Sequence, residues 1–292
     1  MAEPTLPREP PVAARALDVV RELVEPALEA FLLERRAELE PIDAAVLVDE
    51  IRRLVRAGGK RFRPALCFWA FRAAGGREEG AVVRASAAIE LLHTFALVHD
   101  DVMDASDERR GVASTHARFA TEAPAGTDPR RFGLGVAILV GDLAAALADR
   151  LLRTCGAEPG RLAVAQSRFD AMRVRMAAGQ FLDLARRPGT PLGPRVAELK
   201  TGSYTAEGPV SIGTALAGAG PEVEEPLARY ARLVGRAFQL RDDVLDRDAG
   251  PASAAEVDEL IGDARAALEG APLVLDGAGA LDQLASLLRL PR

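Results

Sequence analysis

The stretch AVVRASAAIELLHTFALVHDDVMD, residues 81–104, decides the fold class of this chain. Its apolar residues recur at the three- and four-residue spacing of a helix that is buried on most of its faces. The pattern begins near residue 79, extends for about 39 Å at 1.5 Å per residue, and ends in Asp100, Asp101 and Asp104. Carboxylates at a helix C-terminus are repelled by the helix dipole, so the sequence predicts that cations compensate them.

The rest of the chain continues the helical pattern. Apolar residues recur at helical spacing, glycine and proline clusters separate the segments, and no stretch alternates convincingly as a strand does. The predicted helices span residues 13–39, 43–57, 63–74, 79–104, 132–155, 160–187, 194–219, 222–248, 254–269 and roughly 279–289. We therefore expect a disordered proline-rich segment at residues 1–12, followed at 13–292 by a single all-α bundle of about ten helices around a deep central cavity.

The composition narrows the class of protein. A net charge of -6 over 292 residues disfavours nucleic acid as a partner. Cys67 and Cys155 form neither a disulfide framework nor a metal-ligand spacing, which is typical of a reduced, cytoplasmic protein. The N-terminus lacks the apolar core of a signal peptide. The most apolar stretch, residues 132–148, carries Asp142 in its middle, so no stable membrane insertion is expected.

A second copy of the acidic pattern follows another helical segment, in FQLRDDVLDRDAG at residues 238–250. There Asp242, Asp243 and Asp246 repeat the spacing of the first motif. A single DDxxD pattern is often a solvated turn, but two copies that both oppose the helix dipole are hard to explain in that way. Oxygen ligands suit Mg²⁺, which one or two carboxylates hold together with waters and substrate phosphates. The two motifs therefore predict a phosphate-bearing substrate held through Mg²⁺.

The basic residues fit an anionic substrate. The only two lysines are Lys60 and Lys200, and Lys60 lies with Arg63 at a glycine turn that opens a helix, where backbone N–H groups favour anions. Arg109 and Arg110 directly follow the first aspartate motif. Each of these residues taken alone is more simply interpreted as a solvated surface residue. Together they predict two sets, one that binds a phosphate without metal (Lys60, Arg63, Arg110) and one that supports the metal-bound phosphate (Arg109, Lys200).

These motifs together resemble the trans-isoprenyl diphosphate synthases, also called polyprenyl synthetases. The matching stretches occur in the family order over roughly residues 45–250, and they are GGKRFRP, ELLHTFALVHDDVMDASDERRG, GDLAAALA, GQFLDL, KTGSY and GRAFQLRDDVLD. The resemblance implies the isoprenoid synthase fold, a cytoplasmic homodimer, and a prenyltransferase that joins isopentenyl diphosphate to an allylic diphosphate. It also implies three Mg²⁺ ions in each site, acting as Lewis acids on the leaving diphosphate.

The resemblance also assigns roles to residues. By their positions in the motifs, the residues implied to bind isopentenyl diphosphate are Lys60, Arg63, His93 and Arg110, and those implied to contact the allylic substrate are Arg109, Lys200, Thr201 and Gln239. The implied metal ligands are Asp100, Asp104, Asp242 and Asp246, with Asp101 and Asp243 beside them as further catalytic carboxylates. Without the resemblance, His93 would be interpreted as a core histidine, which remains the interpretation of His99.

Residues before the first motif predict the product length. Phe95, Ala96 and Leu92 lie five, four and eight positions before Asp100, where a product tunnel would run along the helix. A large aromatic residue at five and a small residue at four resemble the geranylgeranyl type, so a C20 product is expected, with farnesyl diphosphate as the alternative.

The chain departs from the family pattern after the second motif. The Gly-Lys loop and the Lys-Thr-bearing stretch that usually follow Asp246 are missing, and no lysine follows Lys200. A non-catalytic or regulatory subunit of a prenyl synthase is therefore a second functional alternative.

Overall fold

The structure is a computed structural model that describes residues 12–185, 193, 196, 198–245 and 252–290, without the side chains of residues 12–14, 200, 252 and 253. Helices make up nearly all of the described part. In chain order the elements are α1 (Val12–Leu39), η1 (Glu40–Ile42), α2 (Ala45–Arg56), α3 (Phe62–Ala73), α4 (Glu79–Met103), β1 (Glu108–Arg109), β2 (Val112–Ala113), α5 (Thr115–Thr121), α6 (Pro129–Arg153), α7 (Pro159–Leu184), η2 (Glu198–Glu207), α9 (Gly208–Ala217), α10 (Pro221–Leu245), α11 (Ala252–Ala266) and α12 (Leu275–Ser286).

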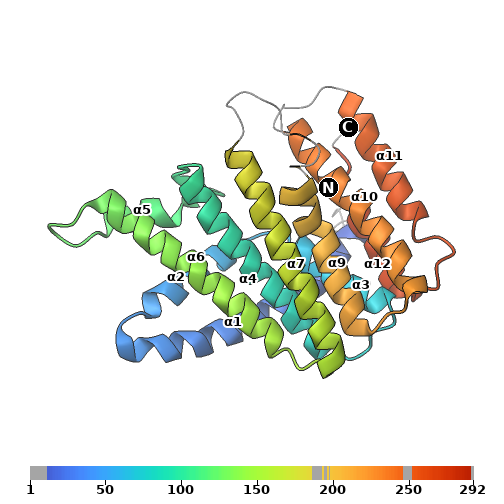
Figure 1. Ribbon diagram of the computed structural model, residues 1–292, viewed down its shortest axis with the longest axis horizontal. Coiled ribbons are helices and arrows are strands. Elements are labelled where there is room, and N and C mark those ends of the chain that lie inside the picture. The colour runs from blue at the N-terminus through green and yellow to red at the C-terminus, as the bar shows by residue number, and fades with distance from the viewer. Residues whose placement is uncertain (1–11, 186–192, 194–195, 197, 246–251, 291–292) are drawn as a thin grey trace, which may run out of the picture.

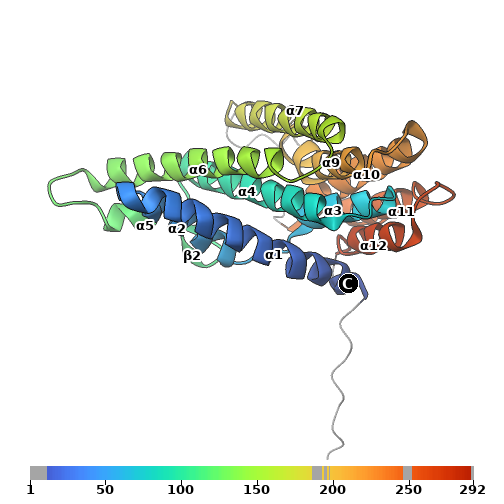
Figure 2. The ribbon, with the colours of Figure 1, turned by 90° about the horizontal axis from the view of Figure 1, so that it is seen from below.

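The helices form layers around α3 and α4. Figure 1 shows α4, α6, α7 and α9 with their long axes side by side, and the two extended aspartate-bearing helices, α4 and α10, both belong to this body. In the view of Figure 2, α7 forms one outer side while α1, α2 and α12 form the opposite one. The predicted all-α fold is confirmed, and the described helices follow the predicted segments closely. The disordered segment expected at 1–12 lies almost wholly outside the described residues.

Three local features were not predicted. The short helix α5 has seven residues, too few for a periodic signal, and the strands of the β1–β2 hairpin have two residues each. The segment predicted as one helix at 194–219 is instead the π-helix η2 followed by the α-helix α9. Pro209 lies in the first turn of α9 and has no N–H. A continuous α-helix across this position would therefore lack one backbone hydrogen bond. Longer π-helical stretches are rare and often occur at functional sites.

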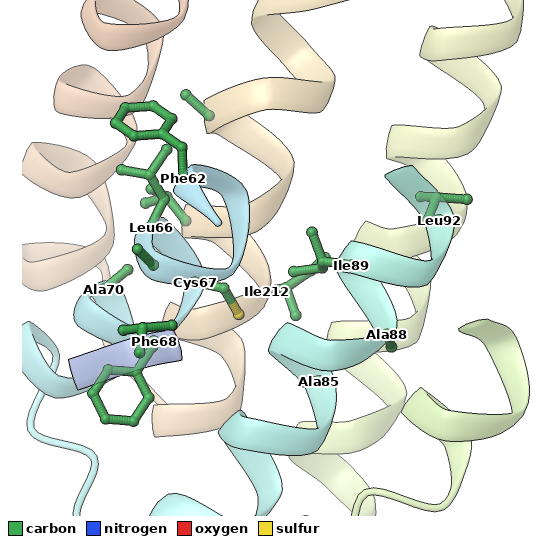
Figure 3. Close-up of a cluster of buried hydrophobic side chains, with 14 of the residues drawn as sticks. Phe62, Leu66, Cys67, Phe68, Ala70, Ala85, Ala88, Ile89, Leu92 and Ile212 are labelled. Carbon is green, nitrogen blue, oxygen red and sulfur yellow. The ribbon is translucent and has the colours of Figure 1, made fainter. Parts of the chain in front are cut away.

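The core packs tightly where α3, α4 and α9 meet. Figure 3 shows Cys67 of α3 facing Ile212 of α9 and Ile89 of α4, with Phe62 and Phe68 on other sides of α3. All five side chains are buried. At Gly213 of α9 the backbones approach so closely that an added Cβ would lie 2.2 Å from the carbonyl oxygen of Cys67. This packing fixes α4, and with it the position of the first aspartate motif.

Two helices, α4 and α6, are long and apolar enough to cross a membrane by length and composition. Asp142 therefore does not disqualify α6 on these criteria, contrary to the sequence-based expectation. In their most apolar windows, however, 67% of α4 and 44% of α6 are buried inside the protein. The burial of α4 is typical of a core helix of a bundle, whereas α6 keeps an exposed apolar face that includes Ile138 and Leu139. The two cysteines are both buried free thiols.

Candidate functional site

The acidic end of α4 is compensated by an arginine that returns from the following hairpin. Arg109 Nε donates to Asp101 Oδ1 at 2.5 Å, and Arg109 Nη2 lies 3.5 Å from Asp100 Oδ2. Asp101 is 2% exposed and turns inward to this arginine. Its burial raises the pKa of the Asp101 carboxyl, although the hydrogen bond to Arg109 opposes that rise. Part of the cationic charge predicted for this helix end is therefore supplied by the protein itself.

The β1–β2 hairpin sends two neighbouring arginines to different places. Arg110 and Gly111 at its turn have φ values of 54° and 77°. Positive φ at two successive central residues is typical of a tight hairpin turn of type I′. While Arg109 contacts the aspartates, Arg110 Nη1 donates to the carbonyl oxygen of Gly58 in the glycine loop. The two roles predicted for these arginines thus correspond to two distinct locations.

A buried carboxylate anchors the segment that follows the hairpin. Glu50 of α2 is fully buried and accepts hydrogen bonds from Arg53 at 2.6 and 2.7 Å, from Thr115 at 2.8 Å and from Arg118. Arg53 Nη2 also donates to the carbonyl oxygen of Ala113 in β2 at 3.0 Å. A buried charge without partners is costly, so this network holds the hairpin and α5 against α2. Sequence analysis missed Glu50, whose only signal is its place on the apolar face of α2.

A second buried ion pair holds the glycine loop at residues 58–60. Arg61 has a left-handed backbone, with φ 55°, and its guanidinium contacts Glu90 Oε1 at 2.6 Å and Glu25 Oε1 at 3.0 Å. It also donates to the carbonyl oxygen of Val55 at 2.7 Å. These contacts occupy the Arg61 guanidinium, although Arg61 lines the pocket described next together with Lys60 and Arg63. The sequence did not distinguish this structural arginine from its neighbours.

The glycine loop borders a pocket of about 560 Å³, here called the cationic pocket. Its lining includes Lys60, Arg63, His93, Arg110, Arg241 and Asp242. This pocket brings together the whole set of residues predicted to bind isopentenyl diphosphate. Burial lowers the pKa of the Arg110 guanidinium, and the positive charges of Arg61, Arg109 and Arg63 lower it further, although Glu90 opposes them. Such a concentration of positive charge favours an anion.

His93 connects the cationic pocket to η2. His93 Nδ1 lies 2.5 Å from the hydroxyl of Tyr204, and the Arg63 guanidinium lies over the Tyr204 ring at 4.4 Å. Arg63 Nη2 also donates to Thr205 Oγ1 at 2.8 Å. Burial lowers the pKa of His93 well below its usual range, with a further contribution from Arg63, so the imidazole is neutral. Burial also raises the pKa of Tyr204, which keeps its hydroxyl protonated. Tyr204 was missed, although it lies in the quoted KTGSY stretch.

A second pocket of about 440 Å³, here called the aspartate pocket, lies beside the first. Asp100 and Asp242 both line it, so one carboxylate comes from each DDxxD motif. Its lining also includes Thr201 of η2 and the predicted tunnel residues Phe95 and Ala96. The two pockets share four residues, Arg63, His93, Phe238 and Asp242. A charged end and an apolar end therefore meet within one continuous site.

Gln180 of α7 also contacts the first aspartate motif. Its Nε2 donates to Asp100 Oδ1 at 3.0 Å and lies 3.7 Å from Met103 Sδ. This amide orients one oxygen of Asp100 from the helix that faces α4 across the pocket. Gln180 belongs to the GQFLDL stretch, but nothing in the local spacing pointed to this contact.

Several predicted site residues either do not line these two pockets or lie outside the described residues. Leu92 is fully buried in the core cluster of Figure 3 and does not line the aspartate pocket. Asp104 is exposed at the end of α4. Gln239 donates to Asp243 Oδ1 at 2.6 Å, and both line a separate pocket of about 480 Å³ between η2, α10 and α11. The side chain of Lys200 and the whole of Asp246 lie outside the described residues.

The donor set of the aspartate pocket fits a hard divalent cation. Within the described ranges, no group of three or more His, Cys, Asp or Glu side chains forms a ready-made metal site. Mg²⁺ does not require one, because it is usually held by one or two carboxylates together with waters and substrate phosphates. Asp100 and Asp242, which line a single pocket, supply ligands of this kind.

The two elements that carry Thr201 and Asp242 cross at a pair of glycines. A Cβ added to Gly235 of α10 would lie 3.0 Å from Cα and 3.0 Å from the carbonyl oxygen of Gly202 in η2. A Cβ added to Gly202 would meet nothing closer than 4.0 Å. The crossing therefore depends on Gly235 and tolerates a methyl group at Gly202.

Comparisons with known proteins identify the family of this chain. Residues 44–257 match the family model described as polyprenyl synthetase. The chain belongs to the polyprenyl synthetase family. The chain is similar to the geranylgeranyl diphosphate synthase of Methanosarcina mazei, with 36% identity over 201 residues, 68% of this chain and 58% of that protein. It is equally similar to the octaprenyl diphosphate synthase of Escherichia coli, with 36% identity over 200 residues, 67% of this chain and 56% of that protein. The matched part thus spans little more than half the length of these relatives.

The fold of the family extends over nearly the whole chain. A crystal structure of geranylgeranyl pyrophosphate synthase from Corynebacterium glutamicum, complexed with isoprenyl diphosphate and magnesium, superposes with a TM-score of 0.84. The superposition covers 96% of this chain and 99% of that one, at 24% sequence identity. This likeness confirms the isoprenoid synthase fold.

The glycine crossing gives a first prediction. Gly235→Ala forces the backbones of η2 and α10 apart, so we expect a loss of about 1–3 kcal/mol in the free energy of unfolding. Gly202→Ala, the matched control, should be neutral or gain roughly 0.5–1 kcal/mol, because alanine loses less backbone entropy in a helix. Urea denaturation measures the free energy of unfolding of both variants. Equal changes in the two variants would contradict the asymmetry of the crossing.

The environment of His93 gives a second prediction. Because its pKa is lowered in the native protein, the unfolded chain binds a proton near pH 6.5 that the native state does not. The stability that His93 contributes is therefore complete above that pH and is lost as the pH falls, by up to about 1.4 kcal/mol per pH unit. Between pH 7.5 and 5.5, His93→Gln should lose roughly 1 kcal/mol less stability than the unchanged protein. Identical pH profiles in denaturant titrations would show that His93 is not a buried neutral group.

Proposed function

We propose that this protein is an Mg²⁺-dependent prenyltransferase that condenses isopentenyl diphosphate with an allylic diphosphate to give geranylgeranyl diphosphate. The observation that carries this proposal is the adjacency of the two pockets. The cationic pocket offers Lys60, Arg63 and Arg110 to a diphosphate, and the aspartate pocket offers carboxylates from both motifs above an apolar lining. Because they share His93 and Phe238, two substrates bound there would lie side by side.

The residues take distinct roles in this proposal. Lys60, Arg63 and Arg110 bind the diphosphate of isopentenyl diphosphate, and neutral His93 lies at the boundary between the pockets. Asp100 and Asp242 hold Mg²⁺, with Asp104 and Asp246 as the further ligands predicted from the motifs. Bound there, Mg²⁺ supplies Lewis-acid activation of the leaving diphosphate of the allylic substrate. Arg109 keeps Asp100 and Asp101 in place and adds positive charge beside that diphosphate.

The side chains around the aspartate pocket also exclude water. Its apolar lining includes Phe95, Leu97, Met176 and Phe238. An allylic substrate that loses its diphosphate leaves an electron-poor carbon that water readily attacks, so a dry wall protects it until the second substrate reacts. The predicted contacts of Lys200, Thr201 and Gln239 with the allylic substrate remain part of this proposal.

Substitution of the first motif tests the function. The purified protein, incubated with Mg²⁺, isopentenyl diphosphate and labelled allylic diphosphates, should form prenyl diphosphates. An allylic diphosphate with Mg²⁺, at about 100 times its dissociation constant, should add roughly 2.7 kcal/mol to the free energy of unfolding. Asp100→Asn with Asp104→Asn should abolish both turnover and this stabilisation, whereas Asp258→Asn on exposed α11 should change neither. Ligand binding without any product would instead favour the alternative of a regulatory subunit.

The position of Phe95 underlies the proposed C20 product. The Phe95 ring packs edge-on against His99 with centroids 4.8 Å apart, and His99 Nε2 lies 3.2 Å from the carbonyl oxygen of Ile138. His99, which lies one turn nearer to Asp100 on α4, thus connects the Phe95 ring to a second helix, α6. The small side chain of Ala96, one residue after Phe95, leaves space in the pocket beside the Phe95 ring. We infer that Phe95 forms the floor of the product tunnel.

Phe95→Ala should therefore lengthen the product, because removal of the ring deepens the cavity. Phe181→Ala is the matched control, since it removes the same ring from the pocket at a position that is 68% exposed. Chromatography of the dephosphorylated products compares the two. An unchanged distribution in Phe95→Ala would place the floor elsewhere, and a C15 product from the unchanged protein would favour farnesyl diphosphate synthase.

We propose further that the enzyme is a cytoplasmic homodimer. Helices α6 and α7 expose apolar residues on the protein surface, including Ile138, Leu139, Val164 and Val174. Such residues on neighbouring helices suit burial against a second copy, as the family resemblance implies. Leu139→Glu should therefore give monomers in analytical ultracentrifugation, while Leu275→Glu, at a site 87% exposed on α12, should not. A monomeric unchanged protein would refute the proposal.

A further inference from the structure

The cationic pocket contains an unusual concentration of unpaired donors. Within the described part of the chain, four buried side-chain polar atoms have no hydrogen-bond partner, namely Arg35 Nε, Arg63 Nε, Ser86 Oγ and Arg241 Nε. Two of the four, Arg63 Nε and Arg241 Nε, belong to residues that line this pocket. A buried donor without an acceptor is destabilising, and most buried polar groups in proteins avoid this state. Two such donors in one pocket indicate that an acceptor binds there.

Arg241 occupies a particular place in this pocket. It lies on α10, directly before the second aspartate motif, and its side chain is only 17% exposed. Its Nη1 lies 3.3 Å from Asp242 Oδ1, while its Nε is the unpaired atom. One guanidinium therefore contacts a proposed metal ligand and borders the pocket of Lys60 and Arg110 at the same time.

The charge of the pocket indicates what the acceptor is. Lys60, Arg63, Arg110 and Arg241 line it together, and the carboxylates among its lining residues include Glu90 and Asp242. Glu90 is already bonded to Arg61 and Asp242 to Arg241. The planar guanidinium group presents donors in a geometry that matches phosphate oxygens, and its hydrogen bonds to anions are among the stronger ones in proteins. A multiply charged oxyanion such as a diphosphate satisfies both Nε atoms and relieves the repulsion between the cations.

We propose that Arg241 is a further substrate-binding residue, which donates to the diphosphate of isopentenyl diphosphate beside Lys60, Arg63 and Arg110. This assignment rests on the proposed function. Because Arg241 also contacts Asp242, it places that diphosphate next to the second metal-binding motif. The competing explanation is that Arg241 only neutralises Asp242. These two explanations differ in which ligand loses affinity when Arg241 is replaced.

Steady-state kinetics of four proteins distinguishes substrate binding by Arg241 from simple neutralisation of Asp242. These are the unchanged enzyme, Arg241→Gln, Arg241→Lys, and the control Arg229→Gln, which removes an exposed arginine from the same helix. Loss of a charge-assisted hydrogen bond should raise KM for isopentenyl diphosphate about tenfold or more in Arg241→Gln. KM for the allylic diphosphate and the Mg²⁺ requirement should change less than about twofold. Arg241→Lys should recover only part of the loss, because lysine keeps the charge but not the planar donors.

A binding measurement keeps this inference separate from the proposed function. Inorganic pyrophosphate, titrated calorimetrically in EDTA without Mg²⁺, reports the cationic pocket without turnover. We expect Arg241→Gln to weaken its binding and Arg229→Gln to leave it unchanged. If the unchanged protein made no prenyl product but bound pyrophosphate in an Arg241-dependent way, the proposed function would fail and the role of Arg241 in binding a diphosphate would stand. An unaltered pyrophosphate affinity and KM in Arg241→Gln, or a loss confined to Mg²⁺, would overturn the role of Arg241.

Discussion

Repulsion between carboxylates at the ends of two helices is the constraint on which the rest of this structure depends. The first motif ends α4 against the helix dipole, and α10 brings Asp242 to the same pocket as Asp100. Two arginines neutralise part of this negative charge. Arg109 contacts Asp100 and Asp101, and Arg241 contacts Asp242. The remaining charge suits Mg²⁺ and the phosphates that it carries. The site thus combines acidic and basic groups whose charges the proposed substrate and metal would balance together.

Two buried ion-pair networks hold this arrangement in place, one outside the two pockets and one in the wall of the cationic pocket. Glu50 ties α2 to the hairpin and α5, and Arg61 ties the glycine loop to α1 and α4. Removal of one member of a buried pair leaves an uncompensated charge, so these contacts leave their segments little freedom. They fix the backbone from which Lys60, Arg109 and Arg110 extend. The geometry of the site therefore depends on these ion pairs as well as on the residues proposed to bind substrate.

In the proposed function, the wall shared by the two pockets lets one site bind two substrates. Arg63 stacks over Tyr204, Tyr204 contacts His93, and His93 borders both pockets. Desolvation keeps His93 neutral, so this wall adds no further positive charge to the arginines around it. An apolar lining that contains Phe95 continues away from the charged end. In the proposed function, charge would hold the diphosphates and the shape of the apolar lining would limit the growing chain.

The sequence by itself determined the helices, because helical periodicity, caps and glycine breaks are local signals. It also determined the chemical character of the site, since two DDxxD motifs and a few basic residues are recognised from the sequence without knowledge of the fold. Only the tertiary structure decided that Asp101 turns to Arg109, that Arg61 is structural while Arg63 borders the pockets, and that Leu92 is buried in the core. It likewise revealed Glu50, Gln180 and Tyr204. Their contacts join positions 65 to 111 residues apart, and no local pattern records which faces of distant helices will meet.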